Sequence, residues 1–190
     1  MLEPSDDHQV TVVLREDVTR DQVDDACWSN GWLLSDILPA SDDAPSRIVF
    51  MTPDRLNLVC YFSDPRMGAQ FFVLSGSDPD AVAAVIHETL PTYKPVHLQH
   101  LLDHPEDADR YLRGVAYSVL SLPNGSPRIT EILGAALKHR LAKVRDEALT
   151  IAFWSGDSRA KKLVAAASRR DPSAKVRNRA RELLGAWPSG

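Results

Sequence analysis

The most regular hydrophobic pattern in the chain lies in its second half, where one short motif occurs three times. Each copy begins with an aliphatic residue and an arginine, then has alanine at the fourth step and apolar residues at the seventh and eighth. Positions with these offsets share one face of a helix, so we predict three amphipathic helices. The copies start at Leu112, Val144 and Val176, 32 residues apart, with arginines Arg113, Arg145 and Arg177 and alanines Ala116, Ala148 and Ala180.

A second apolar stretch precedes each copy, and residues typical of helix ends separate the two. Gly156 can end one helix and Asp157 can cap the next. The pairs Ser126–Pro127 and Asp171–Pro172 predict a cap followed by a proline in the first turn. Three helix pairs of about 32 residues each are typical of a solenoid. The preceding stretches are Val96–Leu102, Ile129–Leu137 and Lys161–Ala167.

The repeated Val-Arg-x-x-Ala pattern resembles the second helix of HEAT repeats, especially the short bacterial kind. The resemblance covers about half of the chain and implies an all-α solenoid of about three helix pairs over residues 93–190. It also implies that Arg113, Arg145 and Arg177 serve a ladder of polar contacts between neighbouring units. The first unit departs from the pattern at Asp107–Arg110, where the others have Ala-Lys, so we expect an atypical joining repeat.

Residues 1–92 show shorter patterns of a different kind. Val10–Leu14 is rich in β-branched residues, Thr19–Gln22 has the form of a capping box, and Asp78–Pro79 opens a second amphipathic helix. We expect a small α+β domain with the order strand, helix, three strands, helix. Both helices should cover one face of a four-stranded meander, whose strand order stays open. The three central strands are expected at Arg47–Met51, Leu56–Phe62 and Gln70–Leu74.

Composition changes this picture little. The 190 residues are 44% hydrophobic, which is ordinary for a soluble protein with a packed core. The acidic start lacks the apolar core of a secretion signal, and no stretch approaches the roughly 18 apolar residues of a membrane span. We therefore expect a cytoplasmic protein without a membrane partner. Cys27 and Cys60 both lie in apolar runs and are expected to be buried thiols.

Charge is distributed unevenly along the chain and bears on partners. Residues 1–127 hold 8 Lys and Arg against 20 Asp and Glu, whereas residues 128–190 hold 14 against 6. Either the basic end meets an acidic molecule, or the two halves of the chain face each other. The residues expected to line a basic surface of the repeats are Lys138, Arg140, Lys161, Lys162, Arg169, Arg170, Arg179 and Arg181.

Candidate catalytic and metal sites are weak. His97, His100 and His104 share one helical face and could hold zinc or iron, although spacing alone favours a solvated polar face. Whether these three bind a metal stays open. Ser75–Ser77 reads as a turn, and no glycine loop has the spacing that binds phosphate. The sequence thus predicts neither a catalytic group nor a cofactor.

These observations favour a non-enzymatic scaffold that binds another macromolecule. The first hypothesis is a protein-binding adaptor or regulator, toxin neutralisation included, with an acidic protein as partner. The second is a nucleic-acid binder that uses the basic repeat surface, for which HEAT-like alkylpurine DNA glycosylases are the precedent. The third is a metal-dependent enzyme built on the three histidines. The identity of the partner and the oligomeric state stay open.

Overall fold

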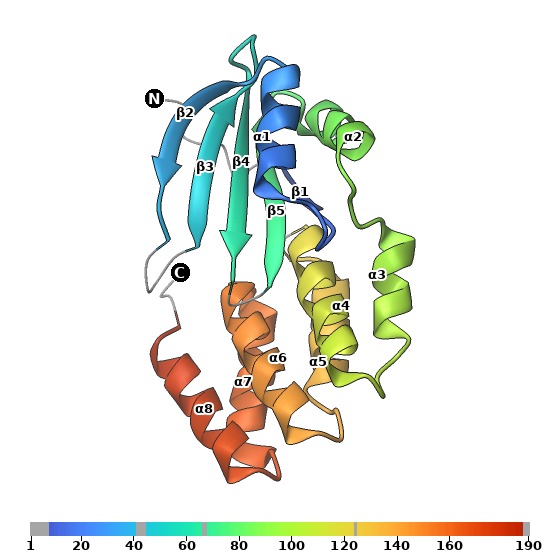
Figure 1. The fold of residues 1–190 in the computed structure, drawn as a ribbon. Coiled ribbons are helices and arrows are strands. Elements are labelled where there is room, and N and C mark those ends of the chain that lie inside the picture. Colours follow the sequence, from blue (N-terminus) through green and yellow to red (C-terminus); the bar gives the residue numbers. More distant parts are fainter. Residues whose placement is uncertain (1–7, 41–44, 66–67, 124, 188–190) are drawn as a thin grey trace. The chain divides into compact units, whose positions relative to one another are not determined.

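A computed structural model of the chain describes residues 8–40, 45–65, 68–123 and 125–187 (Figure 1). The chain divides into two compact units between Lys94 and Pro95, two residues later than the boundary expected from the sequence. The first unit combines an antiparallel sheet with two helices, and the second consists of helices. The chain is thus mixed α and β. Each unit is described by itself below.

The first unit is built on one five-stranded sheet in the order β1-β5-β4-β3-β2, in which every neighbouring pair is antiparallel. Strands β2 to β5 follow one another as a meander, and β1 pairs with β5 at the other edge. The strands are β1 (Gln9–Val13), β2 (Leu33–Leu38), β3 (Ser46–Met51), β4 (Asn57–Asp64) and β5 (Ala69–Gly76).

Two helices accompany the sheet, and both start at the caps that the sequence predicts. Helix α1 (Arg20–Ser29) carries the full capping box: the Thr19 hydroxyl accepts the Gln22 N–H, and the Gln22 side chain accepts the Thr19 N–H. Helix α2 (Pro79–Thr89) is capped by Asp78, which accepts the Ala81 N–H at 3.0 Å. These bonds satisfy first-turn donors that have no partner within the helix.

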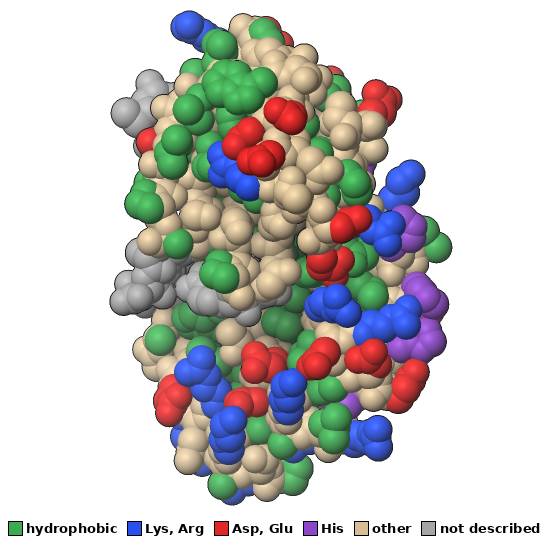
Figure 2. Space-filling view, viewed as in Figure 1, with side chains coloured by type: hydrophobic (Ala, Val, Ile, Leu, Met, Phe, Trp, Pro, Cys, Tyr) green, Lys and Arg blue, Asp and Glu red, His purple; other side chains and the backbone are tan. Residues whose placement is uncertain are grey.

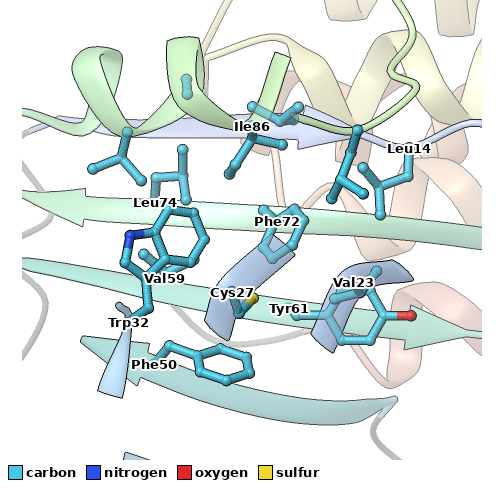
Figure 3. Packing of buried hydrophobic residues seen from close by; sticks show 14 of the residues in the cluster. Leu14, Val23, Cys27, Trp32, Phe50, Val59, Tyr61, Phe72, Leu74 and Ile86 are labelled. Carbon is cyan, nitrogen blue, oxygen red and sulfur yellow. The ribbon is translucent and has the colours of Figure 1, made fainter. Parts of the chain in front are cut away.

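Both helices pack on the same face of the sheet, as the sequence predicts. One hydrophobic cluster joins Val23 and Cys27 of α1 and Ile86 of α2 to the inward side chains of the strands (Figure 3). Phe72 and Val59 are fully buried at its centre. The cluster includes residues of β1, β3, β4 and β5 but none of β2. Four of the five strands are therefore buried on one face by the two helices.

The sequence-based expectation of a four-stranded sheet is wrong, because β2 adds a fifth strand at the edge of the sheet. Its six residues, Leu33–Leu38, are all exposed, so burial leaves no alternating pattern of apolar and polar positions. A β-bulge between Leu34 and Asp36 also breaks the period of two that identifies a strand. The strand is defined by its backbone pairing with β3.

The described residues of the second unit form six helices arranged in successive pairs. Helix α3 packs on α4, α5 on α6, and α7 on α8, while α4, α6 and α8 lie side by side in that order and α5 packs on α7. No helix in the described part of the chain is long and apolar enough to cross a membrane. The helices are α3 (Pro95–Leu102), α4 (Ala108–Ser121), α5 (Pro127–Ala136), α6 (Ala142–Trp154), α7 (Ser158–Arg170) and α8 (Ala174–Gly185).

The three motif copies predicted from the sequence are helical and lie in α4, α6 and α8. Their alanines, Ala116, Ala148 and Ala180, are all buried. In α4 the backbone also comes very close to α3, because a Cβ added to Gly114 would lie 2.8 Å from Leu101 Cβ. Small residues therefore mark the faces on which these helices pack most tightly.

Helix boundaries follow the predicted punctuation with two exceptions. Asp157 caps α7, and Gly156 has the positive φ of +64° that suits a glycine after a helix end. Ser126 stands at the N-cap of α5 but makes no side-chain capping bond. The prediction that Asp171 caps the last helix is wrong, since Ser173 fills that position. Asp171 has a different partner.

Two glycines in neighbouring helices test this packing as a matched pair. Gly114→Ala should lower the free energy of unfolding by about 1–3 kcal/mol, because the added methyl meets α3. Gly134→Ala in α5 meets nothing within 4 Å and should raise it by about 0.5–1 kcal/mol through helix propensity. Urea unfolding measures both. Equal shifts of the two variants would contradict the close approach of α3 and α4.

Candidate functional site

A buried ion pair joins α6 to the turn between α7 and α8. Arg145 Nε donates to Asp171 Oδ2 at 2.7 Å, and Arg145 Nη2 donates to Asp171 Oδ1 at 3.0 Å. The two side chains are only 8% and 3% exposed. This parallel, two-bond geometry is the strong form of an arginine–carboxylate interaction. It fixes the position of the α7–α8 turn on α6.

The same guanidinium also holds the turn between α5 and α6. Arg145 Nη1 donates to the carbonyls of His139 at 2.8 Å and Arg140 at 3.2 Å. Arg177 repeats the arrangement one unit later, with Nη1 bonded to the carbonyls of Asp171 at 2.6 Å and Pro172 at 3.1 Å. In both cases the acceptors lie six and five residues earlier in the chain. Arg113, at the corresponding place in α4, is exposed.

Asp171 is ionised at neutral pH in spite of its burial. Desolvation is the largest single effect and by itself raises the pKa of a carboxyl group. Hydrogen bonds from Arg145 and from the Ser173 N–H, with the charges of Arg145 and Arg177, outweigh it and hold the pKa of Asp171 below its usual value. The carboxylate therefore neutralises the buried guanidinium.

Four exposed cations surround this neutralised pair, and we call them the cationic turn edge. Two lie in or beside the α5–α6 turn and two at the end of α7. In the described part of the chain none of the four makes an ion pair. The turns within the helix pairs lie at one end of the helical unit, the lower end in Figure 1. The four residues are Lys138, Arg140, Arg169 and Arg170.

The first turn of the series, between α3 and α4, is acidic instead. Glu106 lies 32 residues before Lys138, and its carboxylate pairs with His104 Nδ1 at 2.9 Å. His139 occupies the place that Asp171 has one unit later, and it accepts the Leu141 N–H through Nδ1. Its ring stacks on Tyr111 with centroids 5.5 Å apart. The turns within the helix pairs are therefore acidic in the first pair and basic in the second and third pairs.

The exposed face of α4, α6 and α8 carries charges of both signs that pair with one another. Lys143 of α6 bridges to Asp109 of α4 at 2.9 Å. Lys175 occupies the same position one unit later and bridges to Asp146 at 2.9 Å. Figure 2 shows the resulting mixture of basic and acidic side chains over these helices. This face offers few uncompensated charges, in contrast to the cationic turn edge.

The structure divides the eight basic residues that the sequence assigns to one surface. Four form the cationic turn edge. Arg179 and Arg181 lie on α8 and bond within it to Glu182 and Asn178, respectively. Lys161 and Lys162 lie in the first half of α7, where the Lys161 ammonium sits 6.0 Å from the centre of the Trp187 ring. These residues do not form a single patch.

The tryptophans lie at the other end of the helices. Trp187 follows α8, is 8% exposed and packs edge-on against Phe153 with ring centroids 5.4 Å apart. Trp154 is the last residue of α6 and is 37% exposed. The cationic turn edge lies at the start of α6, whose 13 residues span about 20 Å. Trp154 and Trp187 are therefore separated from the cationic turn edge by about the length of a helix.

Two of the three histidines considered for a metal site, His100 and His104, contact other groups. His100 and His104 lie edge to face with ring centroids 5.0 Å apart, and His104 bonds to Glu106. No group of three or more His, Cys, Asp or Glu side chains among the described residues is arranged to hold a metal ion.

The two cysteines lie on opposite faces of the sheet. Cys27 is fully buried in the cluster beneath α1, and desolvation, with a smaller contribution from Asp24, raises the pKa of its thiol to about 12. Cys60 of β4 is only half-buried, which corrects the expectation of a buried residue, and desolvation raises its pKa as well. Both are protonated thiols at neutral pH.

Comparison with known proteins adds no relative: no protein-family model matches the chain, and neither does any curated protein or solved structure.

Truncating the buried arginine should be far more costly than truncating an exposed lysine of the same unit. Arg145→Met leaves the Asp171 carboxylate buried without its main partner, which should lower the free energy of unfolding by about 3–5 kcal/mol. Lys175→Met replaces a side chain that is 82% exposed and should change the free energy of unfolding by less than about 1 kcal/mol. Chemical denaturation of the two variants gives the comparison. Similar losses would show that the buried pair does not hold the turns.

The stability that Asp171 contributes should be lost in acid. Its folded-state pKa lies below that of the unfolded chain, so the contribution is complete above about pH 5 and falls as the pH drops through about 4 and below. Asp171→Asn should therefore be least stable relative to the parent at neutral pH, and the gap should narrow below about pH 4. Urea titrations from neutral to acidic pH measure the gap.

Asp109→Asn is the control, because Asp109 pairs with Lys143 at an exposed position and its pKa is also lowered, first by the Lys143 hydrogen bond. Added salt should remove the effect of the Asp109 change and leave that of Asp171, since buried charges are screened less. A salt-sensitive Asp171 effect would contradict its burial.

Proposed function

We propose that residues 95–187 form a HEAT-like solenoid and that the chain is a non-enzymatic scaffold for another protein. The pairwise packing of α3 to α8 and the lateral contacts of α4, α6 and α8 support the solenoid. The repeated arginine bonds at Arg145 and Arg177 support it too, since they occur at the positions where the resemblance implies a polar ladder. An array of this kind presents an extended surface to a partner.

The cationic turn edge carries the proposal that the partner is acidic. Its four cations make no ion pair with a described residue, and the charge of the nearby Arg145 is already neutralised by Asp171. The edge is also held in place, because Arg145 bonds to both turns. Three of the four residues are arginines, whose planar guanidinium groups match carboxylates with two parallel hydrogen bonds. Aspartate and glutamate side chains on a protein fit this arrangement.

A protein suits this edge better than a nucleic acid does. Single strands are held by aromatic side chains interleaved with cations, and here Trp154 and Trp187 lie at the opposite helix ends from the edge. Trp187 is also enclosed by Phe153 and Lys161. The first turn of the series, with Glu106, is acidic and would repel a long polyanion that ran along all three turns. A short acidic protein segment needs only two turns.

Charge reversal at the cationic turn edge should weaken partner binding much more than an equal reversal elsewhere on the helical unit. Arg140→Glu/Arg170→Glu should weaken capture of the partner at least about tenfold, because each reversal removes an attraction and adds a repulsion. Arg179→Glu/Arg181→Glu changes the net charge equally on α8 and should change binding less than about threefold. The amount of partner captured by the parent and by each double variant is measured by quantitative affinity capture from nuclease-treated native lysate, followed by mass spectrometry.

A defined probe makes the test independent of the lysate. A labelled poly-glutamate peptide, a DNA duplex and an RNA strand of similar total charge are titrated against the same three proteins from about 50 mM to about 500 mM salt. Preference for the peptide, lost only in the edge variant, supports the acidic-protein partner. Stronger binding of either nucleic acid, or equal loss in both variants, would overturn it.

A further inference from the structure

The free edge of β2 is the most exposed apolar feature of the sheet unit. Among the described residues no strand pairs with its outer side, because β2 stands at the end of the strand order. All six of its residues are exposed, and four are large aliphatic side chains. The exposed fractions are 42% for Leu33, 44% for Leu34, 58% for Ile37 and 36% for Leu38. An apolar edge whose backbone groups are not bonded to a neighbouring strand is a template for another strand.

The bulge in β2 arranges these side chains symmetrically. Leu34 pairs with Phe50 and Ile37 pairs with Ile48, and both β3 partners point to the face that the helices cover. Leu33 and Leu38 pair with Met51 and Arg47 and so point to the opposite face. In a strand without a bulge, residues three or five positions apart would lie on opposite faces. Here each face receives two matching aliphatic residues.

This arrangement makes β2 complementary to a second copy of itself. When two β2 strands run antiparallel about a two-fold axis perpendicular to the sheet, residues directly opposite must lie on the same face. Centring the axis between Ser35 and Asp36 places Leu34 opposite Ile37 and Leu33 opposite Leu38. Each of these pairs lies on one face because of the bulge. The two polar residues then meet at the centre.

We propose that the chain forms a two-fold dimer in which the β2 strands of two copies pair antiparallel in this register. The pairing joins two five-stranded sheets into one continuous sheet with the helices of both copies on the same face. It also closes the association, since each copy has one β2 edge and both are used. This inference concerns the sheet unit and does not depend on the function proposed for the helices.

The exposed apolar area fits a weak but specific dimer. Trp28 of α1 is 59% exposed, and α1 lies on the same side of the sheet as Leu34 and Ile37. Figure 2 shows hydrophobic side chains gathered over β2 and α1. From their exposed fractions, Trp28 and the four β2 residues present on the order of 400 Å² of apolar surface per copy. Adding the strand backbone brings the total near the lower limit of stable interfaces, about 1,200 Å².

Asp36 sets a limit on the strength of this pairing. Its carboxylate accepts the Ile37 N–H at 2.8 Å and lies next to the proposed axis, close to the same residue of the second copy. Two like charges near one axis weaken the association. Together with the modest area, this places the expected dissociation constant at about 10–100 µM.

A matched pair of lysine substitutions tests the interface. Ile37→Lys at the edge and Leu56→Lys in the β3–β4 turn replace side chains of equal exposure, 58% and 57%. Sedimentation equilibrium of the full chain up to about 1 mM should show a dimer for the parent and for Leu56→Lys, with a dissociation constant at least about tenfold higher for Ile37→Lys. Circular dichroism confirms that both variants fold.

A charge swap tests the register separately. Leu34→Lys and Ile37→Glu should each weaken the dimer at least about tenfold, whereas the double variant places Lys opposite Glu twice and should recover most of that loss. A double variant no tighter than the single ones would overturn this register. A parent that stays monomeric at about 1 mM would overturn the dimer and leave β2 to a strand of another protein. A Leu56→Lys variant whose dimer is weakened as much as that of Ile37→Lys would likewise overturn the proposed interface.

Discussion

The interaction on which the helical unit depends most is the buried contact of Arg145 with Asp171. Removing both groups from water is costly, and the cost is offset only because the carboxylate receives two parallel bonds and the remaining donor reaches the carbonyls of His139 and Arg140. One guanidinium thus fixes two consecutive turns relative to each other. Because its carboxylate partner neutralises it, this guanidinium adds no net charge to the surrounding surface. The exposed cations on these turns therefore act as a fixed set, uncompensated within the described chain.

Much of the helical unit could be predicted from the sequence, because its amphipathic pattern repeats at a fixed interval. All six helices expected in the second half are present, and the alanine positions are buried. The sheet unit was predicted less completely. Strands β3 and β4 largely alternate buried and partly exposed residues, which gives the period of two, and β5 is mostly buried. Strand β2, by contrast, is exposed on both faces and interrupted by a bulge. Alternation of apolar and polar residues arises where one face of a strand is buried, so a strand exposed on both faces does not show it.

The candidate site was predicted in part. Sequence alone identified the basic residues, but it could not divide them, since helical neighbours such as Arg179 and Glu182 neutralise each other locally while Arg140 has no such neighbour. The role of Asp171 was missed because an acidic residue before proline is usually a helix cap. A shift of 32 residues places His139 at the corresponding position of the preceding unit. The ion pair is not repeated there, because His139 stands in place of the carboxylate and Arg113 is exposed, so the repeat pattern alone does not indicate the role of Asp171.

The two surfaces described here depend on different physical forces, and this separates them experimentally. Attraction between the cationic turn edge and a carboxylate-rich partner weakens as salt screens exposed charges beyond about 8–10 Å. Pairing of β2 strands depends on apolar burial and backbone hydrogen bonds, which sulfate strengthens rather than weakens. Sulfate should therefore act on the two associations in opposite directions. A chain that dimerised through β2 would present two cationic edges at once, and the second binding event to a partner with two acidic segments would become intramolecular. Weak association of the sheet units could thus raise the avidity of the helical ones without any new contact between them.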